Sequence, residues 1–244
     1  MKTVLITGCN RGLGKELIKS FAKNGYCIIS INRRQYNDYD ILCDSLKESY
    51  GVSIYQFYAD LSDEVSIKKT LDKIEEFNLS IDVLINNAGI HQSAKPIFYQ
   101  EYADVLLSMK INYLAPFQIC KRVASLMVRE NKGSIINITS VVSLITEPGG
   151  YSYDASKSAL NILTKSLAME LGPFGIRVNG VACGIMNTDM FNNFDDKIKK
   201  KNLKRVSKGV PVELNDVAKL ILFLASDDAT SITGDIIRID NGFN

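Results

Sequence analysis

Residues 3–14, Thr-Val-Leu-Ile-Thr-Gly-Cys-Asn-Arg-Gly-Leu-Gly, decide the fold of this chain. A short run of apolar and β-branched residues indicates a strand, and the glycine-rich turn after it leads into an amphipathic segment. Glycines let the backbone turn tightly and approach a pyrophosphate, whose charge then lies at the N-terminus of the following helix. The spacing is Gly-x-x-x-Gly-x-Gly. A tight strand–helix connection without a ligand is the alternative interpretation of this motif alone.

The same alternation of short apolar runs and longer amphipathic stretches continues along the whole chain. The predicted strands are Thr3–Thr7, Cys27–Ile31, Ser53–Ala59, Val83–Asn86, Ser134–Ile138, Arg177–Ala182 and Ile236–Asp240. The predicted helices are Leu13–Asn24, Tyr39–Tyr50, Ser66–Phe77, Tyr102–Asn131, Ala155–Leu171 and Asn215–Ser226. Near-continuously apolar strands that are each followed by a helix indicate a doubly wound, seven-stranded parallel sheet with helices on both faces.

We find no internal repeat and no linker, so residues 1–244 are predicted to form one domain. Residues 187–211 break the alternation and carry seven basic residues: Lys197, Lys199, Lys200, Lys201, Lys204, Arg205 and Lys208. An insertion at this position lies at the ligand end of such a sheet, so we predict a substrate lid. The lysines predict either a preference for an anionic substrate or simply a solvated helix face, and the second is the commoner case.

Composition excludes several classes of function. With 46% hydrophobic and 23% charged residues and a net charge of +2, the chain has no global signal for nucleic acid or a membrane surface. Its five cysteines are widely spaced and predict reduced thiols rather than disulfides or a metal site. His91 is the only histidine, which argues against a site with two histidine ligands. The N-terminus leaves no room for a secretory signal, so we expect a soluble, cytoplasmic protein.

The end of the second predicted strand indicates which dinucleotide the glycine loop would hold. A site for NAD usually has an acidic residue there, whereas this chain has Asn32, Arg33 and Arg34, with Arg11 in the loop itself. Arginine binds a 2′-phosphate with a fork of donors, whereas a carboxylate would repel it. We therefore predict NADP(H) as the cofactor, with solvated loop charges as the alternative interpretation.

Tyr153 and Lys157 lie four residues apart on a predicted helix, so both side chains are expected on one face. A cation beside a phenol favours the phenolate and would bring the phenol toward a pH at which it exchanges a proton with an alcohol or carbonyl. An isolated pair of this kind is usually a half-buried aromatic residue beside a solvated charge. The rest of the sequence makes the catalytic interpretation stronger.

Taken together, these motifs resemble the single-domain short-chain dehydrogenase/reductase family over the whole chain. Thr7-Gly8-x-x-x-Gly12-x-Gly14 is similar to the cofactor loop of that family, and Asn86-Asn87-Ala88-Gly89 is similar to its second hallmark. The resemblance implies a Rossmann fold and a catalytic tetrad made of Asn112, Ser140, Tyr153 and Lys157. The cofactor-binding residues it implies are Thr7, Gly8, Asn10, Arg11, Gly12, Leu13, Gly14, Asn32, Arg33, Arg34, Asp60, Leu61, Asn87, Ala88, Gly89, Tyr153, Lys157, Gly184, Ile185 and Thr188.

The resemblance also implies a mechanism and an assembly. Tyr153 would protonate a carbonyl oxygen as hydride arrives, Lys157 would hold the nicotinamide ribose, and Ser140 would bind the substrate oxygen. Asn112 would order a proton-relaying water, and Thr188 would contact the nicotinamide. The helices at Tyr102–Asn131 and Ala155–Leu171 would form the interfaces of a homotetramer.

Two positions depart from the family pattern. Cys183-Gly184 stands where Pro-Gly is common, and Asp240-Asn241-Gly242 stands where Asp-Gly-Gly is frequent. Because the first turn would lie against the nicotinamide, we hypothesise that bound cofactor shields Cys183.

The substrate stays open at this point. The nearest general likeness is to 3-oxoacyl-(acyl carrier protein) reductases, so a 3-oxoacyl thioester is one candidate. The helix end Leu171–Gly175 lacks the basic residues often found in those enzymes, which argues against a carrier-bound substrate. Sugar, steroid and xenobiotic carbonyl reductases share most of the same features, so a sugar or a small ketone is the alternative. Two other classes are an epimerase or dehydratase acting on nucleotide sugars, against which length and glycine spacing argue, and a non-catalytic NADP sensor, which would tend to lose the Tyr-Lys pair.

Overall fold

Seven parallel strands pair in the order β3-β2-β1-β4-β5-β6-β7, in a computed structural model that describes residues 1–92, 95–145, 148–192 and 195–244. The strands are β1 (Thr3–Thr7), β2 (Cys27–Asn32), β3 (Ile54–Tyr58), β4 (Val83–Asn86), β5 (Gly133–Ser140), β6 (Ile176–Cys183) and β7 (Ile236–Ile239). The predicted doubly wound sheet of seven parallel strands is therefore confirmed, and each strand lies within two residues of its predicted bounds.

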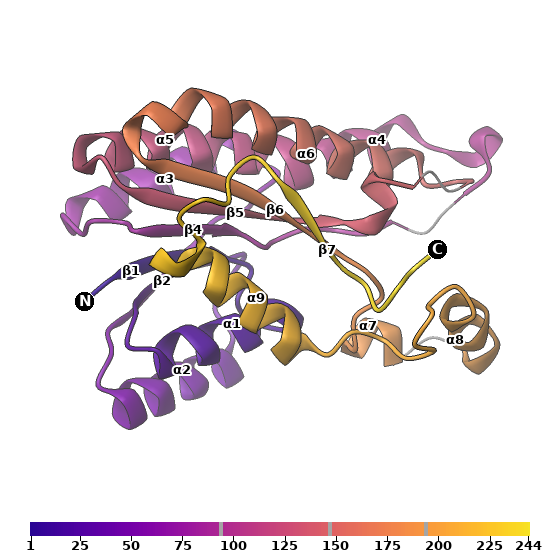
Figure 1. Cartoon of the computed structure of the whole chain (residues 1–244), viewed down its shortest axis with the longest axis horizontal. Helices are drawn as coiled ribbons and strands as arrows, with labels where there is room; N and C mark the ends of the chain where they lie inside the picture. The colour runs from indigo at the N-terminus through magenta and orange to yellow at the C-terminus, as the bar shows by residue number, and fades with distance from the viewer. Residues whose placement is uncertain (93–94, 146–147, 193–194) are drawn as a thin grey trace.

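Helices cover both faces of this sheet (Figure 1). One face carries α1 (Gly12–Lys23), α2 (Asn37–Tyr50) and α9 (Leu214–Ala225). The other face carries α3 (Glu64–Glu76), α5 (Ala115–Glu130) and α6 (Tyr151–Leu171), with α4 (Tyr102–Met109) at one end. Two short helices, α7 (Asp189–Asn192) and α8 (Asp196–Leu203), lie beyond one end of the sheet, close to the C-terminus.

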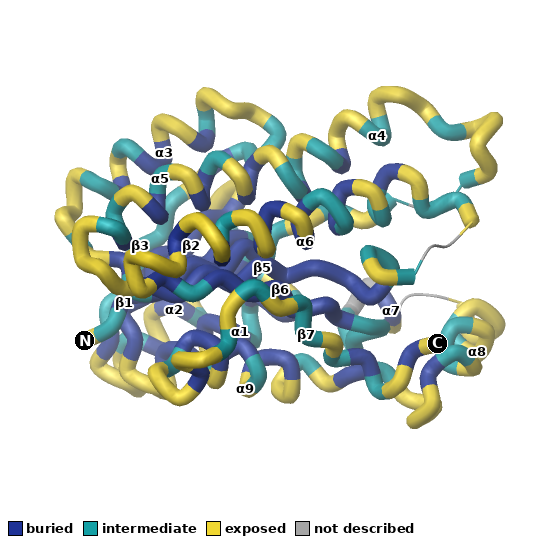
Figure 2. Tube along the Cα trace, turned by 45° about the horizontal axis from the view of Figure 1, so that its top comes forward, coloured by how far each residue is buried: buried dark blue, intermediate teal, exposed yellow. Residues whose placement is uncertain are grey.

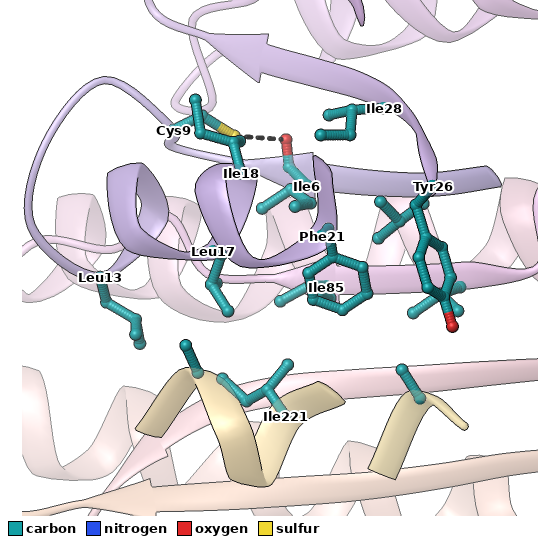
Figure 3. Close-up of a cluster of buried hydrophobic side chains, with 14 of the residues drawn as sticks. Ile6, Cys9, Leu13, Leu17, Ile18, Phe21, Tyr26, Ile28, Ile85 and Ile221 are labelled. Atoms are coloured by element: carbon teal, nitrogen blue, oxygen red, sulfur yellow. Dashed lines mark hydrogen bonds between the residues drawn. The ribbon is translucent and has the colours of Figure 1, made fainter. Parts of the chain in front are cut away.

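Two separate cores result from the alternation of side chains along the strands. Val4 and Ile6 of β1 pack toward α1 and α9, whereas Leu5 between them packs toward α3 and α5. Because both faces are covered, the central strands are buried along their length, which Figure 2 shows as a dark band between the two helix layers. Figure 3 shows the core beneath α1, where Phe21 meets Tyr26 edge to face.

The predicted long helix at Tyr102–Asn131 is divided in the structure. Its two parts, α4 and α5, are joined by one π-helical turn at Lys110–Leu114. Pro116 lies at the start of α5 and has no N–H, so it cannot donate to the carbonyl of Asn112 four residues earlier. The turn widens at this point and Asn112 faces the interior, with none of its surface exposed.

The other differences concern element ends. Helix α6 begins at Tyr151, four residues before the predicted start, so Tyr153 and Lys157 both lie within it. Helix α8 was not predicted, because residues 187–211 lack an apolar period; the helix has no buried residue. Within the described residues, no helix is long and apolar enough to cross a membrane.

Candidate active site

The strand order reverses between β1 and β4, and this reversal fixes where a ligand can bind. Chains leaving β1 and β4 at their carboxyl ends run in opposite directions along the sheet. Open α/β sheets bind their ligands at such a point, outside the carboxyl ends of the strands. Thr7 ends β1, Asn86 ends β4, Ser140 ends β5 and Cys183 ends β6. The sequence-predicted residues that follow these strands are therefore gathered at one edge of the sheet.

The glycine loop between β1 and α1 is built so that side chains cannot occupy it. Gly8 and Gly12 have φ angles of 72° and 51°, in the left-handed region that favours glycine. A Cβ on Gly14 would lie 2.0 Å from the carbonyl oxygen of Gly8, so the first turn of α1 lies directly on the loop. Arg11 at the N-cap of α1 makes no side-chain cap, and the first turn of α1 carries no acidic residue.

A latch of hydrogen bonds holds the loop to the end of β4. The hydroxyl of Thr7 accepts from the backbone N–H groups of Asn87 and Ala88, at 3.1 and 3.0 Å. The amide of Asn87 donates to the carbonyl oxygens of Thr7 and Gly8, both at 2.9 Å. The side chains of Thr7 and Asn87, which were predicted to contact the cofactor, therefore form hydrogen bonds within the protein. These bonds hold the ends of β1 and β4 together.

Of the predicted cofactor contacts at the end of β2, one is buried and two are exposed. Asn32 is buried, and its Oδ1 accepts from the N–H of Cys9 at 2.7 Å, so it supports the glycine loop from below. Arg33 and Arg34 are exposed; Arg33 Nη2 lies 3.5 Å from Asp60, and Arg34 stacks on the ring of Tyr36 at 5.2 Å. Hydrogen bonds from Ser62, together with Arg33, lower the pKa of Asp60.

Asn112 connects the π-helical turn to the segment after β4. Its Oδ1 accepts from the N–H of Ile90, and its Nδ2 donates to the Ile90 carbonyl, both at 2.9 Å. Nδ2 also donates to the hydroxyl of Ser156 at 3.0 Å, and that hydroxyl donates to the Tyr153 carbonyl at 2.7 Å. A Cβ on Gly89 would lie 3.1 Å from Asn112 Oδ1 and 3.3 Å from Lys157 Nζ. The predicted tetrad residue is thus linked to the helix that carries the Tyr-Lys pair.

Tyr153 and Ser140 form the part of the site that can exchange a proton. Burial raises the pKa of the Tyr153 phenol to about 12, and hydrogen bonding with Ser140 opposes this rise. The phenol is therefore protonated at neutral pH. Ser140 is the last residue of β5, and its hydroxyl accepts from the N–H of Val142 at 3.4 Å.

Lys157 is buried with 4% of its surface exposed and donates to the carbonyl oxygen of Ile138 at 2.7 Å. Burial lowers its pKa to about 8. Its Nζ lies 5.9 Å from the centre of the Tyr153 ring, which confirms that the two side chains share one face of α6. The expectation that Lys157 lowers the phenol pKa is not met in the protein alone, because burial dominates the pKa of Tyr153.

His91 was not predicted as a site residue, yet its ring contacts that of Tyr153. The ring centroids lie 4.8 Å apart at an interplanar angle of 69°, an edge-to-face arrangement. His91 is exposed and follows Ile90, whose backbone is held on both sides by Asn112. Its position two residues after Gly89 was the signal in the sequence that could have placed it here.

The turn after β6 places its residues in different surroundings. A Cβ on Gly184 would lie 2.7 Å from the Cα of Asp240, so this turn needs glycine. Cys183 has 3% of its surface exposed without any ligand, and burial raises the pKa of its thiol to about 12. The hypothesis that bound cofactor shields Cys183 is therefore wrong: the protein itself buries the thiol. All five cysteines are free and buried.

The segment predicted as a lid is only partly consistent with a role for its basic residues. Thr188 lies beside the glycine loop, because a Cβ on Gly12 would be 3.8 Å from its Cγ2. The lysines of α8 lie on a helix without buried residues, which agrees with a solvated face. Arg205 does not join them: it stacks on Phe243 and donates to the carbonyl of Asn244. Residues 193–194 of the predicted lid lie outside the described residues.

Three further predicted positions, Leu13, Leu61 and Ile185, pack in three different hydrophobic clusters. Leu13 packs into the core beneath α1, and Leu61 packs against the opposite core. Ile185 packs against a small third cluster formed by Val141, Val206 and Phe243. Among the described residues, no group of three His, Cys, Asp or Glu side chains could hold a metal ion.

The residues at the glycine loop fit a dinucleotide. The loop leaves no room for a side chain at Gly14, the first turn of α1 has no side-chain cap, and two exposed arginines lie at the end of β2. Free N–H groups and positive charge are the donors that a phosphorylated ligand requires.

Comparison with known proteins identifies the family. The family described as enoyl-(acyl carrier protein) reductase matches residues 8–244. The chain is 37% identical over 242 residues to a 3alpha-hydroxysteroid dehydrogenase of Mediterraneibacter gnavus, covering 98% of this chain and 95% of that protein. It is 35% identical over 244 residues to a 3-oxoacyl-[acyl-carrier-protein] reductase of Thermotoga maritima, covering 99% and 97%.

Structural comparison agrees with these matches. A protein of Beutenbergia cavernae assigned as an NAD(P)-dependent gluconate 5-dehydrogenase, solved with NADP at low occupancy, superposes with a TM-score of 0.91. It is 26% identical, and the match covers 99% of this chain and 96% of that one. Members of this family are oxidoreductases that use a nicotinamide cofactor. The chain belongs to the short-chain dehydrogenase/reductase family.

Proposed function

We propose that this protein is an NADPH-dependent reductase that converts a carbonyl to a secondary alcohol, with Tyr153 as the general acid. The observation that carries this proposal is the arrangement of three side chains: the Tyr153 phenol hydrogen-bonds with Ser140, and Lys157 Nζ lies 5.9 Å from the centre of the Tyr153 ring. A phenol held beside a hydroxyl group and a cation can transfer a proton to a carbonyl oxygen. Burial keeps the phenol protonated at neutral pH, which is the form that a reduction requires.

The geometry supports one role for each tetrad residue. Bound NADPH would supply the hydride that reaches the carbonyl carbon. Tyr153 donates its proton to the carbonyl oxygen, and the Ser140 hydroxyl donates a hydrogen bond to the same oxygen as negative charge develops there. Lys157, whose Nζ lies close to Gly89, would hold hydroxyl groups of the cofactor ribose. Both N–H groups of the Asn112 amide donate to atoms of the protein. A proton-relaying water could therefore bind this side chain only by donating to its Oδ1.

The relatives suggest three candidate substrate classes: a 3-oxoacyl thioester, a sugar or small ketone, and a steroid ketone. The test is the loss of reduced-nicotinamide absorbance with acetoacetyl thioester, a ketosugar and a 3-oxosteroid in parallel. We expect NADPH-dependent consumption with one class at a kcat/KM at least tenfold above the others. Binding of NADPH without consumption for any carbonyl would favour the other candidate, a non-catalytic NADP sensor.

The preference for NADPH is supported by the positive charge at the end of β2, where Arg33 and Arg34 are both exposed. We predict that the Arg33→Ala/Arg34→Ala variant binds NADPH at least tenfold more weakly, a loss of about 1.4 kcal/mol or more. Its affinity for NADH should stay within twofold, because the lost contacts are to the 2′-phosphate. Isothermal titration measures both, with Lys19→Ala on the exposed face of α1 as the control. Equal losses for the two cofactors would contradict the assignment.

We also propose a cytoplasmic location and a homotetramer. The five free, buried thiols support a reducing compartment. Exposed apolar side chains on α5 and α6 support an assembly through that face.

A further inference from the structure

The last residues of the chain lie against the segment that follows α8. Val206 forms an antiparallel bridge with Phe243, although every strand of the sheet is parallel. The N–H of Asn244 donates to the Arg205 carbonyl at 2.8 Å, and the N–H of Ser207 donates to the Gly242 carbonyl at 2.8 Å. The two segments are therefore paired by their backbones over several residues.

Side chains reinforce this pairing from both sides. Arg205 stacks on the ring of Phe243 at 4.4 Å, and its Nε donates to the Asn244 carbonyl at 3.0 Å. Asn241 donates to the carbonyl oxygens of Val210 and Pro211, at 3.2 and 3.1 Å. A Cβ on Gly242 would lie 2.7 Å from Ser207 Oγ, so the C-terminal segment is in close contact with the segment after α8 at this turn.

The pairing ends in a small core that borders the catalytic residues. Phe243 and Val206, each 4% exposed, pack with Val141, which directly follows Ser140. The partly buried side chains around this cluster come from three further places: Val142 and Ile145 after β5, Ile185 after β6, and Leu203 at the end of α8. The Phe243 ring thus packs in one cluster with the turn after Ser140, the turn after β6 and the end of α8.

We infer that Phe243, with Arg205 stacked on it, is a positioning residue that sets where α8 and the segment 203–211 lie relative to Ser140. This inference rests on the proposed reductase function, because the site it shapes is the substrate side of that reaction. Of the predicted cofactor contacts, Ile185 borders the cluster, whereas the glycine loop and the arginines after β2 lie outside it. Loosening the cluster should therefore weaken substrate binding much more than cofactor binding.

The variants Phe243→Ala, Phe243→Leu and Arg205→Gln test this role by kinetics. We expect Phe243→Ala and Arg205→Gln to raise the substrate KM at least fivefold, with kcat and the Kd for NADPH each within twofold of wild type. Phe243→Leu should recover most of the KM, because it refills the cluster. Phe77→Ala, which changes a half-exposed ring directly after α3, is the control and should leave KM unchanged. A fall in kcat with KM unchanged would overturn the inference.

Limited digestion with trypsin tests the same role without any substrate. Lys199, Lys200 and Lys201 lie on α8, and Lys68 and Lys69 on α3 provide internal reference sites. In Phe243→Ala and Arg205→Gln, cleavage in α8 should be at least fivefold faster than in wild type, with the α3 sites unchanged. Equal acceleration at both helices would mean general destabilisation and overturn the inference. If the wild type reduces no carbonyl, the proposed function fails, whereas the digestion still decides the role of Phe243.

Discussion

At the scale of single residues, the buried charge of Lys157 lowers the stability of the folded protein. A buried ammonium loses its hydration, and a single carbonyl contact to Ile138 replaces it. Its pKa falls from 10.5 to about 8, so between these values the unfolded chain binds the proton and the folded protein does not. Folding is therefore opposed below pH 8, and the opposition fades as the pH rises through this window.

We predict the consequence for Lys157→Met in the absence of cofactor. The variant should be more stable than wild type near neutral pH, because an apolar chain of similar length replaces a buried charge. The difference should shrink by about 2–3 kcal/mol as the pH rises from 8 to 10.5. Urea unfolding of both proteins across this range measures it, and other titrating groups cancel in the comparison. A pH-independent difference would show that Lys157 keeps its ordinary pKa.

His91 marks the limit of sequence analysis at this scale. The Tyr153–Lys157 spacing predicts a shared helix face, and the structure confirms it. The contact of His91 with Tyr153 depends on the path of the segment after β4, which Asn112 fixes from a distant helix. The position of His91 two residues after Gly89 places it near the end of β4, but no local pattern predicts its contact with the Tyr153 ring. The pKa values were equally out of reach, because burial rather than the neighbouring charge sets them.

At the scale of elements, the glycine loop was predictable because glycine spacing has a direct steric meaning. Gly14 is the most demanding position, since its missing Cβ allows α1 to begin against the Gly8 carbonyl. The π-helical turn was not predictable: its residues have ordinary helical propensity, and the widening follows from Pro116 together with the tertiary contacts of Asn112.

We predict that Gly14→Ala weakens NADPH binding at least tenfold. The added methyl group would lie 2.0 Å from the Gly8 oxygen, so the loop must move away from the ligand side of α1. Gly172→Ala is the matched control, because a Cβ there meets nothing within 4 Å and the backbone is helical. Fluorescence titration with NADPH compares the three proteins. Unchanged affinity in Gly14→Ala would mean that the loop does not hold the cofactor.

At the scale of the whole molecule, the sheet was predictable because parallel strands are covered on both faces. Such strands must be apolar throughout and separated by helices, and both features are visible in the sequence. The segment at residues 187–211 and the C-terminal segment were not predictable in this way. Their arrangement depends on pairing between Val206 and Phe243 and on a cluster whose members come from distant parts of the chain.

The outer face of α5 and α6 supports the proposed homotetramer. Ile162 and Met169 on α6 are 64% and 84% exposed, and Phe117 on α5 is 45% exposed. We predict that Ile162→Arg/Met169→Arg elutes as a smaller species than the wild type, because charges would be buried in the interface. Size-exclusion chromatography with light scattering measures the masses. Ile41→Arg on α2, also exposed, should leave the mass unchanged. A wild type that is already monomeric at micromolar concentration would contradict the tetramer.

The most direct test of the account is the rate of hydride transfer in Tyr153→Phe, measured under single turnover with NADPH and the best carbonyl substrate. The variant keeps the ring that packs on His91 and removes only the phenolic hydroxyl group. We predict a rate lower by about 10²–10⁴-fold with unchanged affinity for NADPH, the usual contribution of a general acid. A rate within a few-fold of wild type would show that another group protonates the carbonyl and that Tyr153 is not the acid.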